Sequence, residues 1–142
     1  MDINREKNII KLFNEYMKTK SIFKDILLIV PKTPQSFTSF PTIVFKESSN
    51  TDYLLGKTLD RTETVDNCNY TVEIYSKDTI LDNTKYNSLD VINELKYWVF
   101  RFFSEIGFNR ITGTKAEYID ITVDRYVCVF QGKFNSWNGQ LI

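Results

Sequence analysis

The chain has 142 residues, of which 42% are hydrophobic and 25% charged, which suits one globular domain (1–142) with its own core and leaves too little for two. Eighteen basic residues balance eighteen acidic ones, so the net charge is zero and exerts no long-range attraction on nucleic acid or an anionic membrane. Because the chain has no histidine, Ser-His-Asp and Cys-His catalysis and imidazole metal ligands are excluded.

The N-terminal third predicts one helix and two strands. Residues 2–19 have apolar side chains on one helical face and charged ones on the other, which favours a helix covering a sheet over a membrane-surface helix. Residues 25–30 predict a short strand that ends at Pro31, and the β-branched and aromatic run 42–46 predicts a second strand. The charged first ten residues do not resemble a secretion signal, so we expect assembly in a cytoplasm.

Residues 47–63 carry turn-forming residues and both signs of charge, with almost no apolar periodicity. A loop of this length inside a small domain is usually either functional or disordered. We therefore expect residues 47–63 to be mobile in the free protein and to order when it assembles.

The middle of the chain gives the clearest patterns. Strict apolar and polar alternation over 64–77 predicts a half-buried strand, and the turn-rich segment 78–86 predicts a linker. The stretch 88–106 has a broad apolar stripe at helical spacing, with Asn87 or Ser88 as the N-cap and Gly107 at the C-terminal cap position. We expect this helix to lie across the sheet.

Two more strands are predicted after the central helix. These are 108–114 and 122–134, separated by a turn at 116–120. Residues 126–130 are apolar on both faces, which places the last strand in the sheet interior. The tail 135–142 has no clear pattern. The order of elements predicts an α+β domain, with a mostly antiparallel sheet of about four strands and an N-terminal helix and one long core helix packed on it.

The sequence contains no complete catalytic motif. The GKT sequence at 56–58 resembles the end of a phosphate-binding loop, but Thr51 stands where that motif needs its first glycine. Acidic residues such as Asp60 and Glu63 are close in sequence, but loop carboxylates are usually solvated. Cys68 and Cys128 are expected to be reduced, buried, small apolar residues. We expect no enzymatic activity, no catalytic residue, no cofactor and no bound metal.

Several segments together resemble one family. They are the runs FPTIVFKE (40–47), SNTD (49–52), DRTE (60–63), YTVEIYSK (70–77), VINE (91–94), FF (102–103), GFNR (107–110), YID (118–120) and RY (125–126). In these the chain resembles the small tail-terminator, or tail-completion, proteins of tailed bacteriophages. The resemblance covers roughly 40–134 and rests on strand and helix patterns with a few polar markers.

The resemblance implies a structural protein of the virion tail, assembled in the host cytoplasm. Such proteins form a ring, commonly of six subunits, on the head-proximal end of the tail tube. The ring stops tube growth and provides the docking surface for the head connector. The implied partners are other copies of the chain, the tail tube protein and the head-completion or connector protein. No membrane and no specific nucleic acid is implied, although DNA could pass through the ring.

A ring requires contacts between unlike faces of identical subunits, and subunits that meet on a repeating template can stay monomeric beforehand. We place the loop 47–63 at the inner or tube-facing surface, where four charged side chains would make contacts: Lys57, Asp60, Arg61 and Glu63. The polar face of the central helix could border a neighbouring subunit through Asn93, Glu94, Lys96, Tyr97 and Arg101.

Three alternatives remain from the sequence. The chain could be a head-completion or connector subunit of the same kind of particle, a small cytoplasmic interaction module, or a hydrolase that uses carboxylates. A position between head-completion and tail-tube genes would favour the terminator, and an enzyme would need a buried carboxylate pair in a pocket.

Overall fold

The structure is a computed structural model that describes residues 5–52, 65–116, 122–135 and 140–141, with side chains described over 9–46, 69–116 and 122–132. The fold is α+β, as predicted. The described residues form two helices, α1 (Arg5–Lys20) and α3 (Ser88–Glu105). The strands are β1 (Leu28–Val30), β2 (Thr42–Asp52), β3 (Val65–Ser76), β4 (Thr79–Leu81), β5 (Thr84–Tyr86), β6 (Asn109–Ala116), β7 (Asp124–Asn135) and β8 (Gln140–Leu141).

The main sheet has the strand order β1-β2-β3-β7-β6, and β8 pairs with the end of β7. The β1–β2 pair is parallel and the other pairs are antiparallel. The sheet thus has six strands where we expected about four, because the short strands β1 and β8 join the longer ones. Strand β7 lies between β3 and β6, which confirms its interior position.

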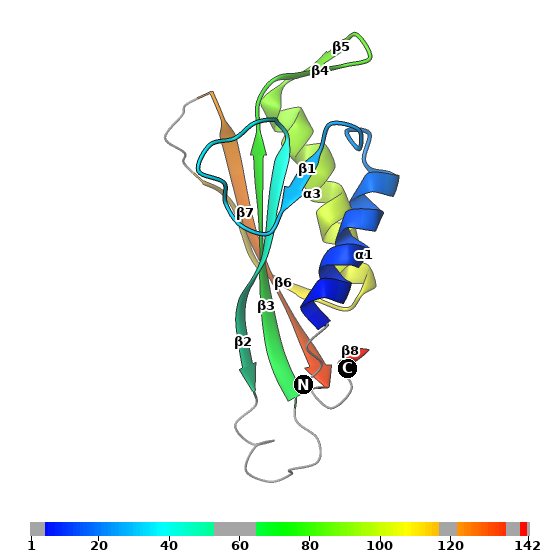
Figure 1. Cartoon of the computed structure of the whole chain (residues 1–142), viewed down its shortest axis with the longest axis vertical. Coiled ribbons are helices and arrows are strands. Elements are labelled where there is room, and N and C mark those ends of the chain that lie inside the picture. Colours follow the sequence, from blue (N-terminus) through cyan, green and yellow to red (C-terminus); the bar gives the residue numbers. More distant parts are fainter. Residues whose placement is uncertain (1–4, 53–64, 117–121, 136–139, 142) are drawn as a thin grey trace.

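Both helices lie on one face of the sheet (Figure 1). Helix α3 begins after the N-cap Asn87, whose side-chain oxygen accepts a hydrogen bond from the Asp90 amide at 2.9 Å. It ends before Gly107, which has a φ of 86°, and the Phe108 amide then bonds to the Phe103 carbonyl at 2.8 Å. This left-handed glycine cap follows the position predicted from the sequence.

The main core lies between the helices and the sheet and is rich in aromatic rings. Phe103 of α3 stacks on Phe130 of β7, with ring centroids 4.0 Å apart. Phe13 of α1 stacks on Phe45 of β2 at 4.5 Å, so each helix is anchored to a different part of the sheet. The stripe on α3 predicted to be apolar is buried as expected.

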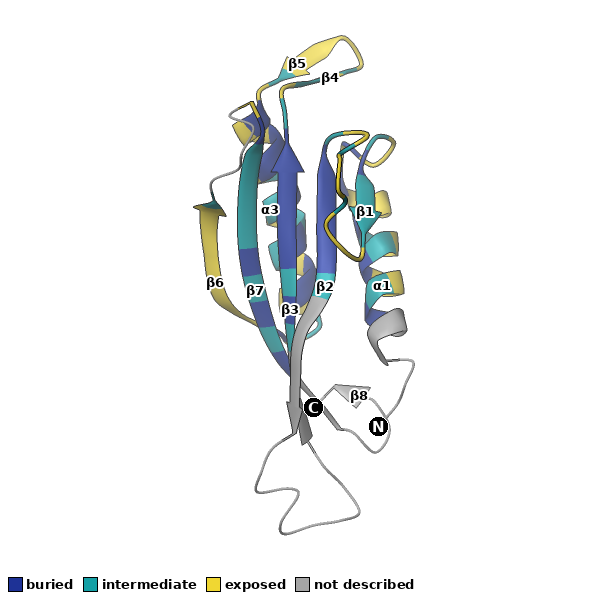
Figure 2. Ribbon diagram, turned by 60° about the vertical axis from the view of Figure 1, so that its left-hand side comes forward, coloured by how far each residue is buried: buried dark blue, intermediate teal, exposed yellow. Residues whose placement is uncertain are grey.

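The opposite face of the sheet is partly covered by the loop 31–41, which crosses in front of it (Figure 1). Phe37 and Phe40 of this loop pack with Val44 and Tyr75 in a second, smaller cluster. By contrast, β6 at the sheet edge is exposed along nearly its whole length (Figure 2).

Three predicted boundaries are corrected. Strand β2 continues to Asp52, so residues 47–52 of the predicted loop are strand, because β3 supplies backbone partners as far as Asp66 whatever the side chains are. The predicted tail contains strand β8, and β7 extends to its first residue. The predicted linker 78–86 contains the hairpin β4–β5, whose turn places Asp82 and Asn83 at positive φ.

Candidate interaction surfaces

Four of the nine predicted contact residues lie in the segment 53–64, outside the described residues. They are Lys57, Asp60, Arg61 and Glu63. The segment joins β2 to β3, the two strands that form the longest hairpin of the fold. Their role stays a prediction.

Two of the five contact residues predicted on α3, Tyr97 and Arg101, are exposed one turn apart. The Arg101 guanidinium donates a hydrogen bond from Nη1 to the Tyr97 hydroxyl at 3.1 Å, and its Nη2 lies 3.7 Å from the Glu105 carboxylate. These contacts hold the Arg101 side chain along the helix surface. The structure therefore brings Tyr97 and Arg101 together as one exposed polar and aromatic feature.

Glu94, which we predicted on the exposed polar face of this helix, instead braces another part of the chain. Its carboxylate accepts hydrogen bonds from the Ser21 hydroxyl at 2.8 Å and from the Ile22 amide at 3.1 Å. The Trp98 indole donates a third at 2.8 Å. The carboxylate thus fixes the turn after α1 against α3, and its acceptor sites are used inside the subunit.

A groove of about 350 Å³ runs between α1 and α3. Its lining comes from both helices and consists of Leu12, Glu15, Tyr16, Thr19, Lys20, Phe102, Glu105 and Ile106. Leu12 is 49% exposed although it is a large aliphatic residue. Burial is the largest cause that raises the pKa of the Tyr16 phenol, followed by the charge of Glu105, so this phenol stays protonated at neutral pH.

The hairpin β4–β5 forms a second surface at the end of the molecule where α3 begins (Figure 1). Ile80 on this hairpin is 72% exposed, more than any other large hydrophobic side chain among the described residues. The sequence pattern does not predict this exposure, because a single isoleucine in a turn-rich segment carries no periodic signal.

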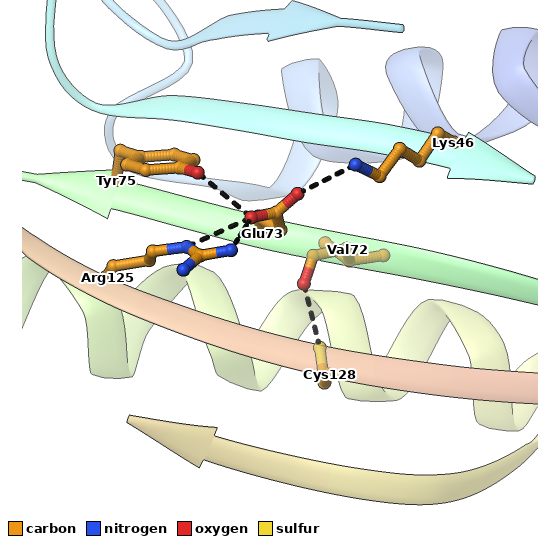
Figure 3. A network of polar contacts seen from close by, with 6 residues as sticks. All are labelled: Lys46, Val72, Glu73, Tyr75, Arg125 and Cys128. Carbon is orange, nitrogen blue, oxygen red and sulfur yellow. Dashed lines mark hydrogen bonds and ion pairs between the residues drawn. The ribbon is translucent and has the colours of Figure 1, made fainter. Parts of the chain in front are cut away.

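A buried charged cluster lies on the sheet face away from the helices, and the sequence did not predict it (Figure 3). The Glu73 side chain on β3 is 4% exposed. Its Oε1 accepts hydrogen bonds from the Tyr75 hydroxyl at 2.9 Å and from Arg125 Nε at 3.0 Å. Its Oε2 lies 3.1 Å from Lys46 Nζ.

The cluster joins three neighbouring strands and keeps the carboxylate ionised. Burial by itself raises the pKa of the Glu73 carboxyl, but the hydrogen bonds from Arg125, Tyr75 and Lys46 outweigh it and hold the pKa below its ordinary value. The pKa of the Tyr75 phenol is raised to about 12, by burial first and by the Glu73 carboxylate second. A carboxylate held ionised and almost fully enclosed is suited to joining strands.

The remaining polar chemistry of the described residues is sparse. The Cys128 thiol is buried and donates toward the Val72 carbonyl at 3.5 Å, and burial raises its pKa to about 12 (Figure 3). The backbone of Cys68 pairs with Gly132, whereas Cys128 pairs with Val72, so the two cysteines are offset by four residues along the paired strands. Over the described residues, no group of three or more acidic or cysteine side chains is placed to hold a metal ion.

No family model matches the sequence, and neither does any curated protein. Within the described part of the chain, neither helix is both long and apolar enough to cross a lipid bilayer.

Proposed function

We propose that the chain is a structural subunit of a phage tail or phage-tail-like particle, a tail terminator that forms a ring on the head-proximal end of the tail tube. In this role the ring stops tube growth and offers a docking surface to the head connector. The proposal gives the chain a structural role and not a catalytic one, and it places the protein in the virion tail.

The observation that carries the proposal is the length of the β2–β3 hairpin compared with the helix layer. Its strands have 11 and 12 residues, which corresponds to ~40 Å, whereas the 18 residues of α3 span ~27 Å. Strand β7, also with 12 residues, pairs with β3 along its whole length. This end of the sheet accordingly extends beyond the helix layer (Figure 1). A projecting sheet end of this kind suits a subunit that must contact a neighbour or a tube lying outside its own body.

Ring formation then follows from contacts between unlike faces. If each subunit uses one face to bind a second, different face on the next, a rotation that closes gives a ring. Each contact can be weak in solution, because six made together on a repeating tube end act at a high effective concentration. The free protein is then monomeric and assembles on its template.

The test combines purified protein with tail tubes isolated from particles that lack a terminator. Electron microscopy should show tube ends capped by rings, and light scattering should show that the free protein has a lower mass than the ring. A protein that never engages tubes at any concentration would exclude the proposal. Binding to the head connector without any binding to tubes would favour a head-completion subunit instead.

A variant isolates the role of the predicted contact segment. The fourfold change Lys57→Ser, Asp60→Ser, Arg61→Ser and Glu63→Ser leaves the net charge unchanged and should abolish tube capping. The matched control is Lys115→Ser with Asp124→Ser, which also leaves the net charge unchanged and removes an ion pair of 3.7 Å on β6 and β7. If both variants cap tubes equally well, the contact segment is assigned wrongly.

A further inference from the structure

Six large hydrophobic side chains of the described residues are exposed: Leu12, Ile22, Ile80, Leu89, Tyr97 and Ile111. Two of them, Ile80 and Leu12, mark separate surfaces. We call the outer face of the β4–β5 hairpin, which carries Ile80 and Lys85, the hairpin end. We call the site between α1 and α3 that contains Leu12 the helix groove. A head-to-tail contact between identical subunits requires two unlike surfaces of this kind.

The hairpin end is anchored to the core through the inner face of the hairpin. Alternation along β4 and β5 turns Leu81 and Tyr86 toward the core, where the Tyr86 ring lies 5.2 Å from that of Phe23. Ile80 and its cross-strand partner Lys85 share the opposite face. This face therefore presents one exposed β-branched side chain beside one ammonium group.

The turn after α1 connects the hairpin to the rest of the fold. The Ile22 amide donates a hydrogen bond to Glu94 on α3, and the neighbouring Phe23 contacts Tyr86 of β5. A two-stranded hairpin is only marginally stable alone. This one is anchored on its inner face, and Ile80 on its outer face is 72% exposed.

The helix groove offers a complementary shape and charge. It is a concave site between two helices, with Leu12, Phe102 and Ile106 among the lining residues. The same lining contains two carboxylates, Glu15 and Glu105, and one amine, that of Lys20. An isoleucine side chain fits among the aliphatic and aromatic residues, and Glu15 can pair with an incoming lysine because Glu105 already has Arg101 as a partner.

We propose that the hairpin end of one subunit docks in the helix groove of the next copy, with Ile80 in the groove and Lys85 beside Glu15. This inference rests on the proposed ring and names the contact that would close it. The occupant of the groove is a second copy of this chain, because the hairpin end combines the most exposed large hydrophobic side chain of the described residues with a lysine that can pair with Glu15.

A disulfide test distinguishes this contact from others. In a Cys68→Ser background, which leaves the buried Cys128 in place, protein carrying Ile80→Cys is mixed with protein carrying Leu12→Cys under oxidising conditions and under conditions that give rings. A head-to-tail contact predicts mixed disulfides in clear excess over either homodimer. The matched control replaces Ile80→Cys by Ile111→Cys, which is also exposed but lies outside both surfaces.

Substitutions give an independent readout of affinity. Ile80→Asp should weaken self-association by about thirtyfold, the change expected when a central anchor residue of an interface is lost. Lys85→Glu should weaken it less, and Glu15→Lys should restore it when the two changes are combined. The control Ile111→Asp should leave self-association unchanged.

The outcomes separate this inference from the proposed function. Rings that cap tubes without any mixed disulfide above the Ile111→Cys control would overturn the hairpin contact and leave the terminator role standing. Mixed disulfides in a protein that never engages tubes would support the contact and exclude the terminator role. A protein that shows neither would exclude both.

Discussion

Arg125 Nε lies 3.0 Å from Glu73 Oε1, and this contact joins strands β7 and β3 on the sheet face away from the helices. Lys46 reaches the other carboxylate oxygen from β2, so one side chain connects three strands of the sheet. The carboxylate is nearly fully buried, while Lys46 and Arg125 remain partly exposed.

Replacing this carboxylate by an amide should destabilise the protein. We expect Glu73→Gln to lower the free energy of unfolding by ~1.5–3 kcal/mol, because charge-assisted hydrogen bonds are lost at a buried site. Urea unfolding followed by circular dichroism measures the change. The control is Glu105→Gln, which breaks an exposed pair and should cost at most ~0.5 kcal/mol. Equal effects of the two changes would contradict the structural role of Glu73.

The same carboxylate predicts a dependence of stability on acidity. Its pKa in the folded protein lies below the ordinary value of 4.5, so the unfolded chain binds the proton more readily. The stabilisation is therefore complete above about pH 4.5 and is lost as the pH falls through the lower, folded-state pKa. Unfolding curves of the original protein and of Glu73→Gln should converge in acid. A difference that stays constant down to the acid limit would argue against this assignment.

The Cys128 thiol should be almost unreactive in the folded protein. Its pKa is raised from 9.0 to about 12, which lowers the thiolate fraction at neutral pH by about a thousandfold before steric protection is counted. Labelling with a thiol reagent in a Cys68→Ser background should be slow in buffer and fast in urea. A Cys128→Ser variant that retains Cys68 provides the comparison. Rapid labelling in buffer would mean that the thiol is accessible.

Removing the Glu94 side chain should loosen the turn after α1. Glu94→Ala removes an acceptor shared by Ser21, Ile22 and Trp98, and we expect a loss of ~1–3 kcal/mol because the Ser21 side chain is buried. Hydrogen exchange at the Ile22 amide should accelerate, while exchange at the Phe108 amide in the α3 cap should change only as far as global stability does. Glu94→Gln, which keeps one acceptor oxygen, should lie between.

A methyl group at Gly132 should disturb the packing of β7 against Phe108, which immediately precedes β6. A Cβ atom there would come within 2.4 Å of the Phe108 ring, a clash that we expect to cost ~1–3 kcal/mol in Gly132→Ala. Because the cause is this ring, Gly132→Ala combined with Phe108→Leu should destabilise the protein by less than the sum of the two single changes. Simple additivity would show that the backbone, and not the ring, is responsible.

The sequence alone predicted the elements whose signal is local. The stripe on α3, its asparagine cap and its glycine terminus are set by spacing along a few turns, and all three are present. The alternation in β3 likewise identified a strand, and the apolar run in β7 identified an interior one. These patterns are readable because helix and strand periods fix which side chains share a face.

Only the tertiary structure decided the features that depend on distant residues. The extension of β2 to Asp52 depends on backbone pairing with β3, and the Glu73 cluster depends on a register that brings Lys46 and Arg125 together from strands far apart in sequence. The sequence pattern predicted Glu94 as a surface residue, but in the fold its carboxylate accepts a hydrogen bond from Ser21, which lies 73 positions away. The sequence determined the parts of this protein, because periodicity is local, and the tertiary structure decided which polar groups are used inside the subunit and which apolar ones stay exposed.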